Sequence, residues 1–295
     1  MNDKKMIWGH IVGIITVLCW GGTFINTKYL IMGGLKPHEI FFLRFLIAYI
    51  CIWFISPRRL FCDHWKDEAL MVLIGITGGS LFFQAENMAV ALSYTTNVSF
   101  IGCTAPLITT CMAIAMVKSV KADTRLVLGS LIALAGVGIV IFNGQFVLHL
   151  NPLGDLLALL SAMAWAVYSL LMKRASLRYG AVFITRKVFF YGLITILPMF
   201  AIEPWTFPFH DFLKPTIWLN LLFLGFVASF VCFALWSWVI RKIGAMKASN
   251  YIYLNPITTV IASAIFLDEP MTIMAYVGSA LILVGVYVSN QAKGI

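Results

Sequence analysis

The segment "LCWGGTFINTKYL", residues 18–30, returns in altered form as "MAWAVYSLLMKRA", residues 163–175. Trp20 of the first segment aligns with Trp165 of the second. The match continues along the chain, at nearly the same offset, in further pairs: Gly9 with Gly154, Lys28 with Lys173, Arg44 with Arg186, Gly75 with Gly225, Pro106 with Pro256, Gly129 with Gly278, and Gly136 with Gly285. The repeat predicts a chain built from two halves of similar structure.

The composition of the chain is that of a membrane protein. Hydrophobic residues make up 61% of the 295 residues and charged residues only 11%, whereas soluble domains carry about 25% charged residues. A helix of about 20 apolar residues crosses a hydrocarbon core roughly 30 Å thick. Such runs occupy ten segments: residues 7–30, 38–56, 69–92, 95–117, 125–142, 153–173, 182–201, 216–240, 248–267 and 271–291. Because these runs do not alternate as barrel strands do, we predict an all-α integral membrane protein with ten transmembrane helices.

The Lys and Arg residues are distributed unevenly between the predicted loops. With a cytoplasmic N-terminus, the outer segments hold only Lys28, Lys36 and Lys214, while most of the 21 Lys and Arg residues lie on the inner side. This positive-inside bias predicts that both termini are cytoplasmic. The net charge of +9 is then a consequence of topology, and no nucleic-acid partner is expected.

The two halves of the repeat, residues 1–148 and residues 149–295, each contain five predicted crossings. Because five is an odd number, the second half must sit upside down relative to the first. Inverted repeats of this kind are typical of secondary transporters, whose substrate site lies near the midplane between the repeats. The pattern therefore predicts a small-molecule site between two inverted five-helix repeats, within the lipid bilayer.

Short motifs recur in the same order in both halves. The openings "CWGGTF" and "AWAVYS" are each followed by an Arg early in the second helix and a Pro in the fourth, and "FLDEPMT", residues 266–272, precedes a Gly-rich last helix. In these features the chain resembles the drug/metabolite transporter superfamily, specifically its EamA-like ten-helix branch. The resemblance implies a multi-pass protein of the bacterial inner membrane that exports small metabolites, such as amino acids or drug-like compounds, by alternating access.

Charged residues within the predicted helices are candidates for gating or proton coupling, because charges in hydrocarbon are rare and usually face a cavity or a partner. Arg44 and Glu86 lie at matching depth below the outer ends of the second and third helices. They could form an ion pair that joins the two helices, or Glu86 could bind and release a proton as the cavity opens. Arg186, the counterpart of Arg44, lies near the inner face and could belong to a second gate.

Polar and aromatic residues inside the helices are candidates for substrate binding. Gln84 and Asn87 share one face of the third helix, since they are three residues apart. Trp20 and Trp165 lie in mid-helix, away from the interfaces where Trp concentrates, and an aromatic lining accepts apolar and cationic groups. Further candidates are Tyr168, Trp236, Tyr253 and Asn255. The alternative for each residue is a packing role or an interhelical hydrogen bond.

The two aligned prolines have a defined effect on the backbone. Pro106 and Pro256 each remove the helical hydrogen bond to the carbonyl four residues earlier, at Gly102 and Ile252. These carbonyls could accept from a substrate ammonium group or from water and hydroxyl side chains, and a simple kink is the alternative.

Other functions have less support in the sequence. Neither HExxH nor GxSxG occurs and no P-loop is present, so a membrane-embedded enzyme or an ATP-driven pump is not favoured. The six cysteines form no CxxC pair, and neither a metal site nor a cofactor is expected. An antiporter for anionic phosphorylated metabolites would need several cations in the cavity, and a membrane receptor is a further alternative. Monomer and homodimer, and proton coupling and facilitated diffusion, are all open at this point.

Overall fold

The computed structural model describes residues 3–56, 59–93, 95–116, 123–142, 151–258, 261 and 273–292. All regular elements in this part of the chain are helices. Among the described residues, six helical segments could cross a membrane by length and composition: Met6–Met32, Trp65–Leu92, Val98–Met116, Pro152–Ala175, Ala181–Ile202 and Pro215–Ile243. Shorter apolar helices cover Thr124–Val140 and Tyr276–Asn290. The all-helical, multi-pass class predicted from the composition is therefore confirmed.

The helices of the first part of the chain are α1 (Asp3–Gly21), α2 (Thr23–Met32), α3 (Pro37–Trp53), α4 (Trp65–Gly75), η1 (Ile76–Ser80), α5 (Leu81–Leu92), α6 (Thr95–Gly102), α7 (Ala105–Met116) and α8 (Thr124–Phe142). Those of the second part are α9 (Pro152–Ala175), α10 (Ala181–Ile202), η2 (Phe209–Leu213), α11 (Pro215–Leu222), η3 (Phe223–Val231), α12 (Cys232–Ile243), α13 (Ala245–Ser249), η4 (Asn250–Leu254) and α15 (Ile273–Asn290). The segments η1 and η3 are π-helical turns within longer apolar helices, and η2 and η4 are 3-10 helices.

Three of the predicted helices are interrupted within their length. A break at Gly22 separates α1 from α2, a turn just before Pro106 separates α6 from α7, and α13 passes into the 3-10 segment η4 just before Pro256. A proline lacks a backbone donor and restricts the residue before it, which accounts for the interruptions before Pro106 and Pro256. The "FLDEPMT" segment lies outside the described residues, and the number of ten spans stays a prediction.

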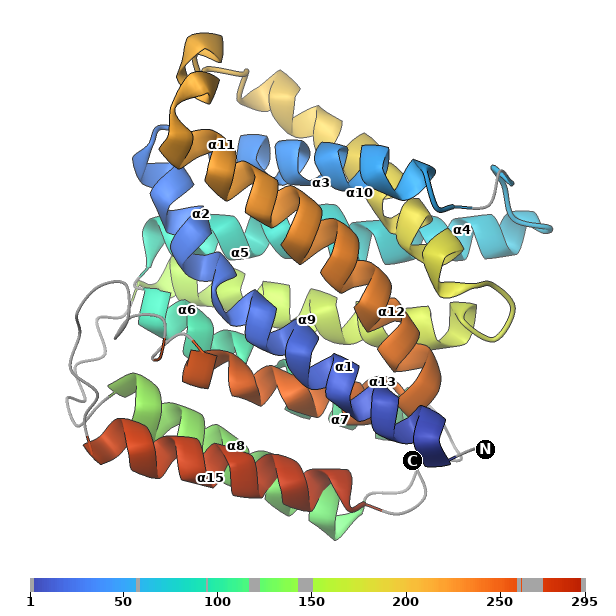
Figure 1. The fold of residues 1–295 in the computed structure, drawn as a ribbon, viewed down its shortest axis with the longest axis vertical. Helices are drawn as coiled ribbons and strands as arrows, with labels where there is room; N and C mark the ends of the chain where they lie inside the picture. The colour runs from blue at the N-terminus through green and yellow to red at the C-terminus, as the bar shows by residue number, and fades with distance from the viewer. Residues whose placement is uncertain are drawn as a thin grey trace.

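The Gly-rich helices α8 and α15 pack side by side along one edge of the molecule (Figure 1). A Cβ atom on Gly129 would lie 2.4 Å from the backbone nitrogen of Ser289, and one on Gly285 would lie 2.4 Å from the backbone nitrogen of Ala133. Only glycine permits backbones to approach this closely. Small residues are enriched at such contacts because van der Waals packing, and not the hydrophobic effect, holds helices together in lipid.

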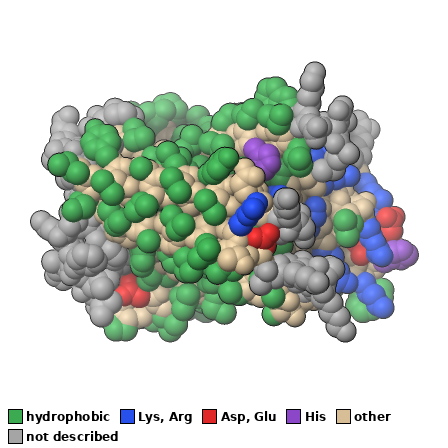
Figure 2. All heavy atoms as spheres, turned by 90° about the horizontal axis from the view of Figure 1, so that it is seen from below, with side chains coloured by type: hydrophobic (Ala, Val, Ile, Leu, Met, Phe, Trp, Pro, Cys, Tyr) green, Lys and Arg blue, Asp and Glu red, His purple; other side chains and the backbone are tan. Residues whose placement is uncertain are grey.

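The start of α1, the start of α4 and the end of α15 lie at the same end of the molecule (Figure 1). Figure 2 shows that apolar side chains cover much of the face seen from below, and that Lys and Arg side chains gather mainly at its right-hand end. An apolar face suits contact with lipid chains. We call the end that holds the starts of α1 and α4 the cation-rich end. Its assignment to the cytoplasmic side stays a prediction from the charge bias.

Candidate functional site

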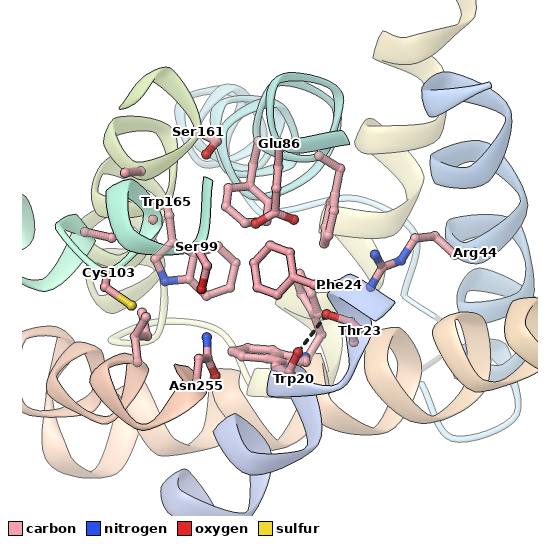
Figure 3. Close-up of a pocket in the computed structure, with 17 residues that line it drawn as sticks. Trp20, Thr23, Phe24, Arg44, Glu86, Ser99, Cys103, Ser161, Trp165 and Asn255 are labelled. Carbon is pink, nitrogen blue, oxygen red and sulfur yellow. Dashed lines mark hydrogen bonds between the residues drawn. The ribbon is translucent and has the colours of Figure 1, made fainter. Parts of the chain in front are cut away.

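A cavity of about 70 Å³ lies inside the helical bundle, among side chains of α1, α2, α3, α5, α9 and α12 (Figure 3). Its walls also include the two helix breaks that precede prolines, through Gly102 and Cys103 in one break and Ile252 and Asn255 in the other. A space of this size holds only a few water molecules. No group of three or more His, Cys, Asp or Glu side chains that could hold a metal ion is present among the described residues.

Trp20 and Trp165, the aligned pair from the two parts of the chain, meet at the cavity wall. Their ring centroids are 5.4 Å apart with an interplanar angle of 86°, which is an edge-to-face contact. Nε1 of Trp20 donates to the carbonyl of Ala228 at 2.9 Å. Nε1 of Trp165 is buried and has no hydrogen-bond partner among the described residues. A buried donor without an acceptor is costly, so this N–H is a candidate donor to a bound ligand.

Arg44 and Glu86 reach the same cavity from α3 and α5 (Figure 3). Nε of Arg44 donates to Oγ of Ser229 at 2.9 Å, and its guanidinium carbon lies 4.2 Å from the centroid of the Phe83 ring. Within the described residues, no ion pair at 4.0 Å or less involves either Arg44 or Glu86. The two residues thus present separate charges of opposite sign to one space.

The two helix breaks bring backbone groups to the cavity. Gly102 and Ile252 are both part of the lining. Pro106 cannot donate to the carbonyl of Gly102, whereas the carbonyl of Ile252 accepts from the backbone N–H of Asn255 at the end of η4. A Cβ atom added at Gly102 would meet no other atom within 4 Å, so this position is open. Asn255, which precedes Pro256, adds an amide. Discontinuous helices line substrate and ion sites in many transporters, and the geometry here is of that kind.

The structure places Gln84 and Asn87 outside the cavity lining. Asn87 is buried, and its Nδ2 donates to the carbonyl of Pro37 at 3.2 Å, which joins α5 to the start of α3. Phe83 and Glu86 of the same helix face the cavity instead. Helical geometry explains the difference, since each residue is displaced by about 100° around the axis from the one before it.

Three further aromatic candidates pack behind the cavity wall and do not line it. Tyr168, Trp236 and Tyr253 are fully buried. The Trp236 ring centroid is 5.1 Å from that of Trp20, and the Tyr168 centroid is 5.0 Å from that of Trp165. Tyr168 lies one helical turn after the cavity-lining Trp165 in α9, and Trp236 lies one turn after the cavity-lining Phe233 in α12. This aromatic layer therefore lies between the cavity and the cation-rich end.

Arg186 lies away from the cavity, near the start of α10. It donates to the backbone carbonyl of Arg59, and its guanidinium carbon lies 5.0 Å from the Trp53 ring centroid and 5.2 Å from that of Phe183. The structure therefore keeps Arg186 apart from Arg44. A gating role for either arginine stays a prediction.

A polar cluster that we did not predict from the sequence joins α4 to α10 beside Arg186. Lys187 forms an ion pair with Glu68, which also accepts from the hydroxyl of Tyr191. The Lys187 side chain is 3% exposed and that of Glu68 is 20% exposed. The cost of a buried ammonium group indicates that Lys187 needs a partner, but hydropathy does not indicate which carboxylate supplies it.

The start of α4 and the segment before it are held by further contacts at the cation-rich end. Asp67 accepts from Nη1 of Arg178 at 3.1 Å and from the Tyr179 hydroxyl at 2.9 Å. Burial raises the pKa of the Cys62 thiol to about 12, and it also raises the pKa of the Tyr179 hydroxyl to about 12. Both groups therefore stay protonated near neutral pH, and the start of α4 is fixed against the turn that follows α9.

Comparisons with known proteins find relatives along nearly the whole chain. The model of the EamA-like transporter family matches residues 7–142 and, separately, residues 152–291. An uncharacterized transporter of Archaeoglobus fulgidus is 25% identical, with 99% of each chain covered. A probable amino-acid metabolite efflux pump of Escherichia coli is 23% identical over 95% of this chain and 93% of its own. A protein of known crystal structure shares the fold at 17% identity, with a TM-score of 0.76 over 98% of this chain and 96% of its own.

Proposed function

The chain belongs to the EamA-like transporter family, and from this premise we propose that it exports small zwitterionic metabolites, such as amino acids or drug-like compounds of similar charge, across the bacterial inner membrane. Membership makes the protein a membrane transporter of small metabolites and not an enzyme. The observation that carries the finer proposal is a cavity in which Arg44 and Glu86 face the same space without pairing. The name of the Escherichia coli relative also supports amino-acid metabolites.

A zwitterion complements this cavity in each of its parts. A substrate carboxylate accepts from the guanidinium of Arg44, and a substrate ammonium group donates to the carboxylate of Glu86; charge-assisted bonds of this kind are about twice as strong as neutral ones. The Trp20 and Trp165 rings offer an apolar surface for the side chain of the substrate. Both membrane charges then gain the partner that the described protein residues do not supply.

The size of the cavity supports alternating access. Ligand sites commonly measure about 300–1,000 Å³, whereas this cavity measures about 70 Å³. An amino acid therefore enters only when the surrounding helices move apart. In this proposal, the cavity is contracted at a point between the two open states of the transport cycle.

The division into two inverted halves, residues 1–148 and residues 149–295, is part of the same proposal. The separate family matches to residues 7–142 and residues 152–291 support it. Helix breaks before Pro106 and Pro256 also support it, because they fall at aligned positions and both reach the cavity. With an odd number of spans in each half, rocking of one half against the other would open the cavity to each side in turn.

The barrier toward the cation-rich end has two layers in this proposal. The aromatic layer of Tyr168 and Trp236 lies directly behind the Trp pair. Beyond it, the Lys187–Glu68 ion pair ties α10 to α4. Opening the cavity toward that end requires both layers to separate.

The antiporter for phosphorylated metabolites has less support from the cavity. A phosphate group is bound by several cations, commonly arginines. Among the described lining residues, Arg44 supplies a cation and Glu86 supplies an opposing carboxylate. A dianionic substrate would be repelled by Glu86, so we retain the zwitterion as the substrate class.

Binding of leucine, its decarboxylated amine and its N-acetyl derivative to the purified protein tests the charge assignment. Arg44→Gln should weaken leucine binding more than tenfold and leave amine binding nearly unchanged, because the amine lacks the carboxylate that Arg44 binds. Glu86→Gln should weaken leucine binding and spare the N-acetyl derivative. A hydrogen bond to a charged group contributes about 1.5–3 kcal/mol, which corresponds to these changes.

Lys28→Gln is the matched control, since Lys28 is a cation of α2 that does not line the cavity. It should bind all three compounds as the parent protein does. Equal losses for leucine and for its amine in Arg44→Gln would contradict the assignment of the carboxylate to Arg44. Metabolite profiling of cells with and without the protein then identifies the natural substrate and the direction of its transport.

A further inference from the structure

A second and larger cavity lies outside the helical core, at the cation-rich end. Its volume is about 470 Å³, within the range of about 300–1,000 Å³ that is common for ligand sites. It is bounded by α4, by the end of α9 and by the turn that follows α9. Its floor is apolar and includes Leu70 and Leu73 of α4 and Leu171 of α9.

The rim of this groove is basic. Lys66, Arg174 and Arg178 lie along it, together with the carboxylate of Asp67. The carboxylate of Asp67 already has partners, because it accepts from Arg178 and from the hydroxyl of Tyr179. Lys66 and Arg174 are exposed, and neither forms an ion pair within the described residues. The groove therefore combines two cations without an ion-pair partner among the described residues, Lys66 and Arg174, with an apolar floor.

We propose that this groove binds an anionic phospholipid, with its phosphate between Lys66 and Arg174 and an acyl chain along the leucine floor. An amphipathic anion matches both parts of the groove. Free phosphate would leave the leucines in water, and a zwitterionic lipid would compensate the two cations only in part. Basic pockets between transmembrane helices select anionic lipids for the same reason.

The position of the groove suits this occupant. Lys66 and Trp65 begin α4, and the Lys66 ammonium lies 5.9 Å from the Trp65 ring centroid; Trp is enriched at the interface where headgroups lie. Leu73 is 51% exposed and lies deeper along the same helix. An acyl chain would therefore run along α4 from the headgroup level into the hydrocarbon. The bound lipid would hold α4 to the end of α9, whatever the transported substrate is.

Native mass spectrometry of the detergent-purified, full-length protein tests this site by titration with phosphatidylglycerol. The parent protein should bind phosphatidylglycerol more tightly than phosphatidylethanolamine. The double variant Lys66→Gln/Arg174→Gln should bind phosphatidylglycerol about 30-fold more weakly, because each cation near a headgroup contributes about fivefold. Arg174→Gln alone should weaken phosphatidylglycerol binding about fivefold. Because the Arg174 side chain is exposed, this variant should keep the stability of the parent protein.

The control double variant Arg241→Gln/Lys242→Gln removes the same charge at the end of α12, outside the groove. It should keep the parent affinity for phosphatidylglycerol. Equal loss in the control would show that net charge, and not the groove, sets the affinity, and would overturn the proposal. Equal binding of the two lipids by the parent protein, or competition by inorganic phosphate alone, would also overturn it.

Discussion

Arg44 and Glu86 are two residues of opposite charge that line one cavity, and in our proposal both contact the substrate. Arg44 is 2% exposed, yet Ser229 and the Phe83 ring satisfy only part of its guanidinium. Glu86 has no ion-pair partner among the described residues, although it shares a cavity with Arg44. A cation and a carboxylate that faced only each other would form a closed structural pair. Because they lie apart and face one cavity, they favour a zwitterionic ligand, with one charged group for each of them.

Trp165 makes a first prediction at the residue scale. Trp165→Ala should weaken binding of leucine about tenfold or more, since it removes a ring contact and a candidate donor from the cavity wall. Trp165→Phe should retain the ring contact and lose only part of the affinity. Isothermal titration on protein that remains monodisperse in gel filtration measures both. Parent-like affinity in the Ala variant would assign Trp165 to packing.

Glu86 makes a second prediction. In proteoliposomes we expect an imposed pH gradient to drive transport by the parent protein, because a carboxylate that faces the cavity can take up a proton when the substrate leaves. Glu86→Gln has the shape of the protonated acid and should lose this dependence while substrate exchange continues. If the gradient has no effect on the parent protein, the protein is a facilitator and Glu86 serves only in binding.

At the scale of the helices, the breaks and turns decide where polar groups reach the core. The break before Pro106 and the 3-10 segment before Pro256 both open toward the cavity. The π-helical turns η1 and η3 interrupt the apolar helices that contain the aligned glycines Gly75 and Gly225. Such turns are frequent at functional sites. The cavity is thus lined both by continuous helices, α3 and α9, and by interrupted ones, whereas α8 and α15 are regular helices joined by close glycine contacts.

The ion pair between α4 and α10 makes a prediction at this scale. Glu68→Gln should destabilise the protein by about 3–5 kcal/mol, because it leaves the buried ammonium group of Lys187 without its partner. Lys187→Gln should cost less, because Glu68 is partly exposed and still accepts from the Tyr191 hydroxyl and the Cys62 backbone N–H. The double variant should recover most of this stability and should favour the state that is open toward the cation-rich end. Thermal unfolding in detergent measures the first effect, and the accessibility of a cysteine placed at Ser161, a buried residue of the cavity lining, measures the second.

The exposed pair Arg59 and Asp63 is the matched control for that experiment. Their side chains are 46% and 59% exposed, and water screens an exposed ion pair so that it adds little to stability. Arg59→Gln and Asp63→Asn, alone or together, should leave unfolding nearly unchanged. A double Lys187/Glu68 variant that is as unstable as Glu68→Gln alone would remove the ion pair as the cause.

At the scale of the whole molecule, the uneven distribution of Lys and Arg predicts the orientation in the membrane. The cations gather at the end that holds the starts of α1 and α4 (Figures 1 and 2). Away from that end, the segment between the end of α10 and the start of α11 carries η2 and a group of aromatic rings, including Trp205 and Phe209. Aromatic residues of this kind are enriched at membrane interfaces.

Topology supplies the prediction at this scale. In a cysteine-free background, Phe209→Cys should react with an impermeant maleimide added to intact cells, and Phe61→Cys should react only after the membrane is opened. Both positions are strongly exposed, at 77% and 65%, so access to the reagent and not burial determines the result. The reverse pattern would contradict the predicted orientation, and labelling of both in intact cells would contradict the separation of the two ends.

Hydropathy and charge predicted the helical membrane class, and together with the internal repeat they singled out five residues that the structure brings to one cavity: Trp20, Trp165, Arg44, Glu86 and Asn255. The reason is that lipid imposes its requirements on each helix separately: a span must be apolar, its backbone must be helical, and a charge within it needs a reason to be there. These requirements are local, so they can be read along the chain. The roles of the five residues in binding or gating stay predictions.

The rotation of each helix about its own axis is not local, and only the tertiary structure decided it. Contacts with α3 turn α5 so that Phe83 and Glu86 face the cavity and Asn87 binds the carbonyl of Pro37. The same applies to Lys187, whose partner Glu68 lies far away in the sequence. Such pairings depend on how helices that are distant in the sequence pack together. In lipid this packing depends on the fit between two helix surfaces, which the pattern of residues in one helix does not reveal.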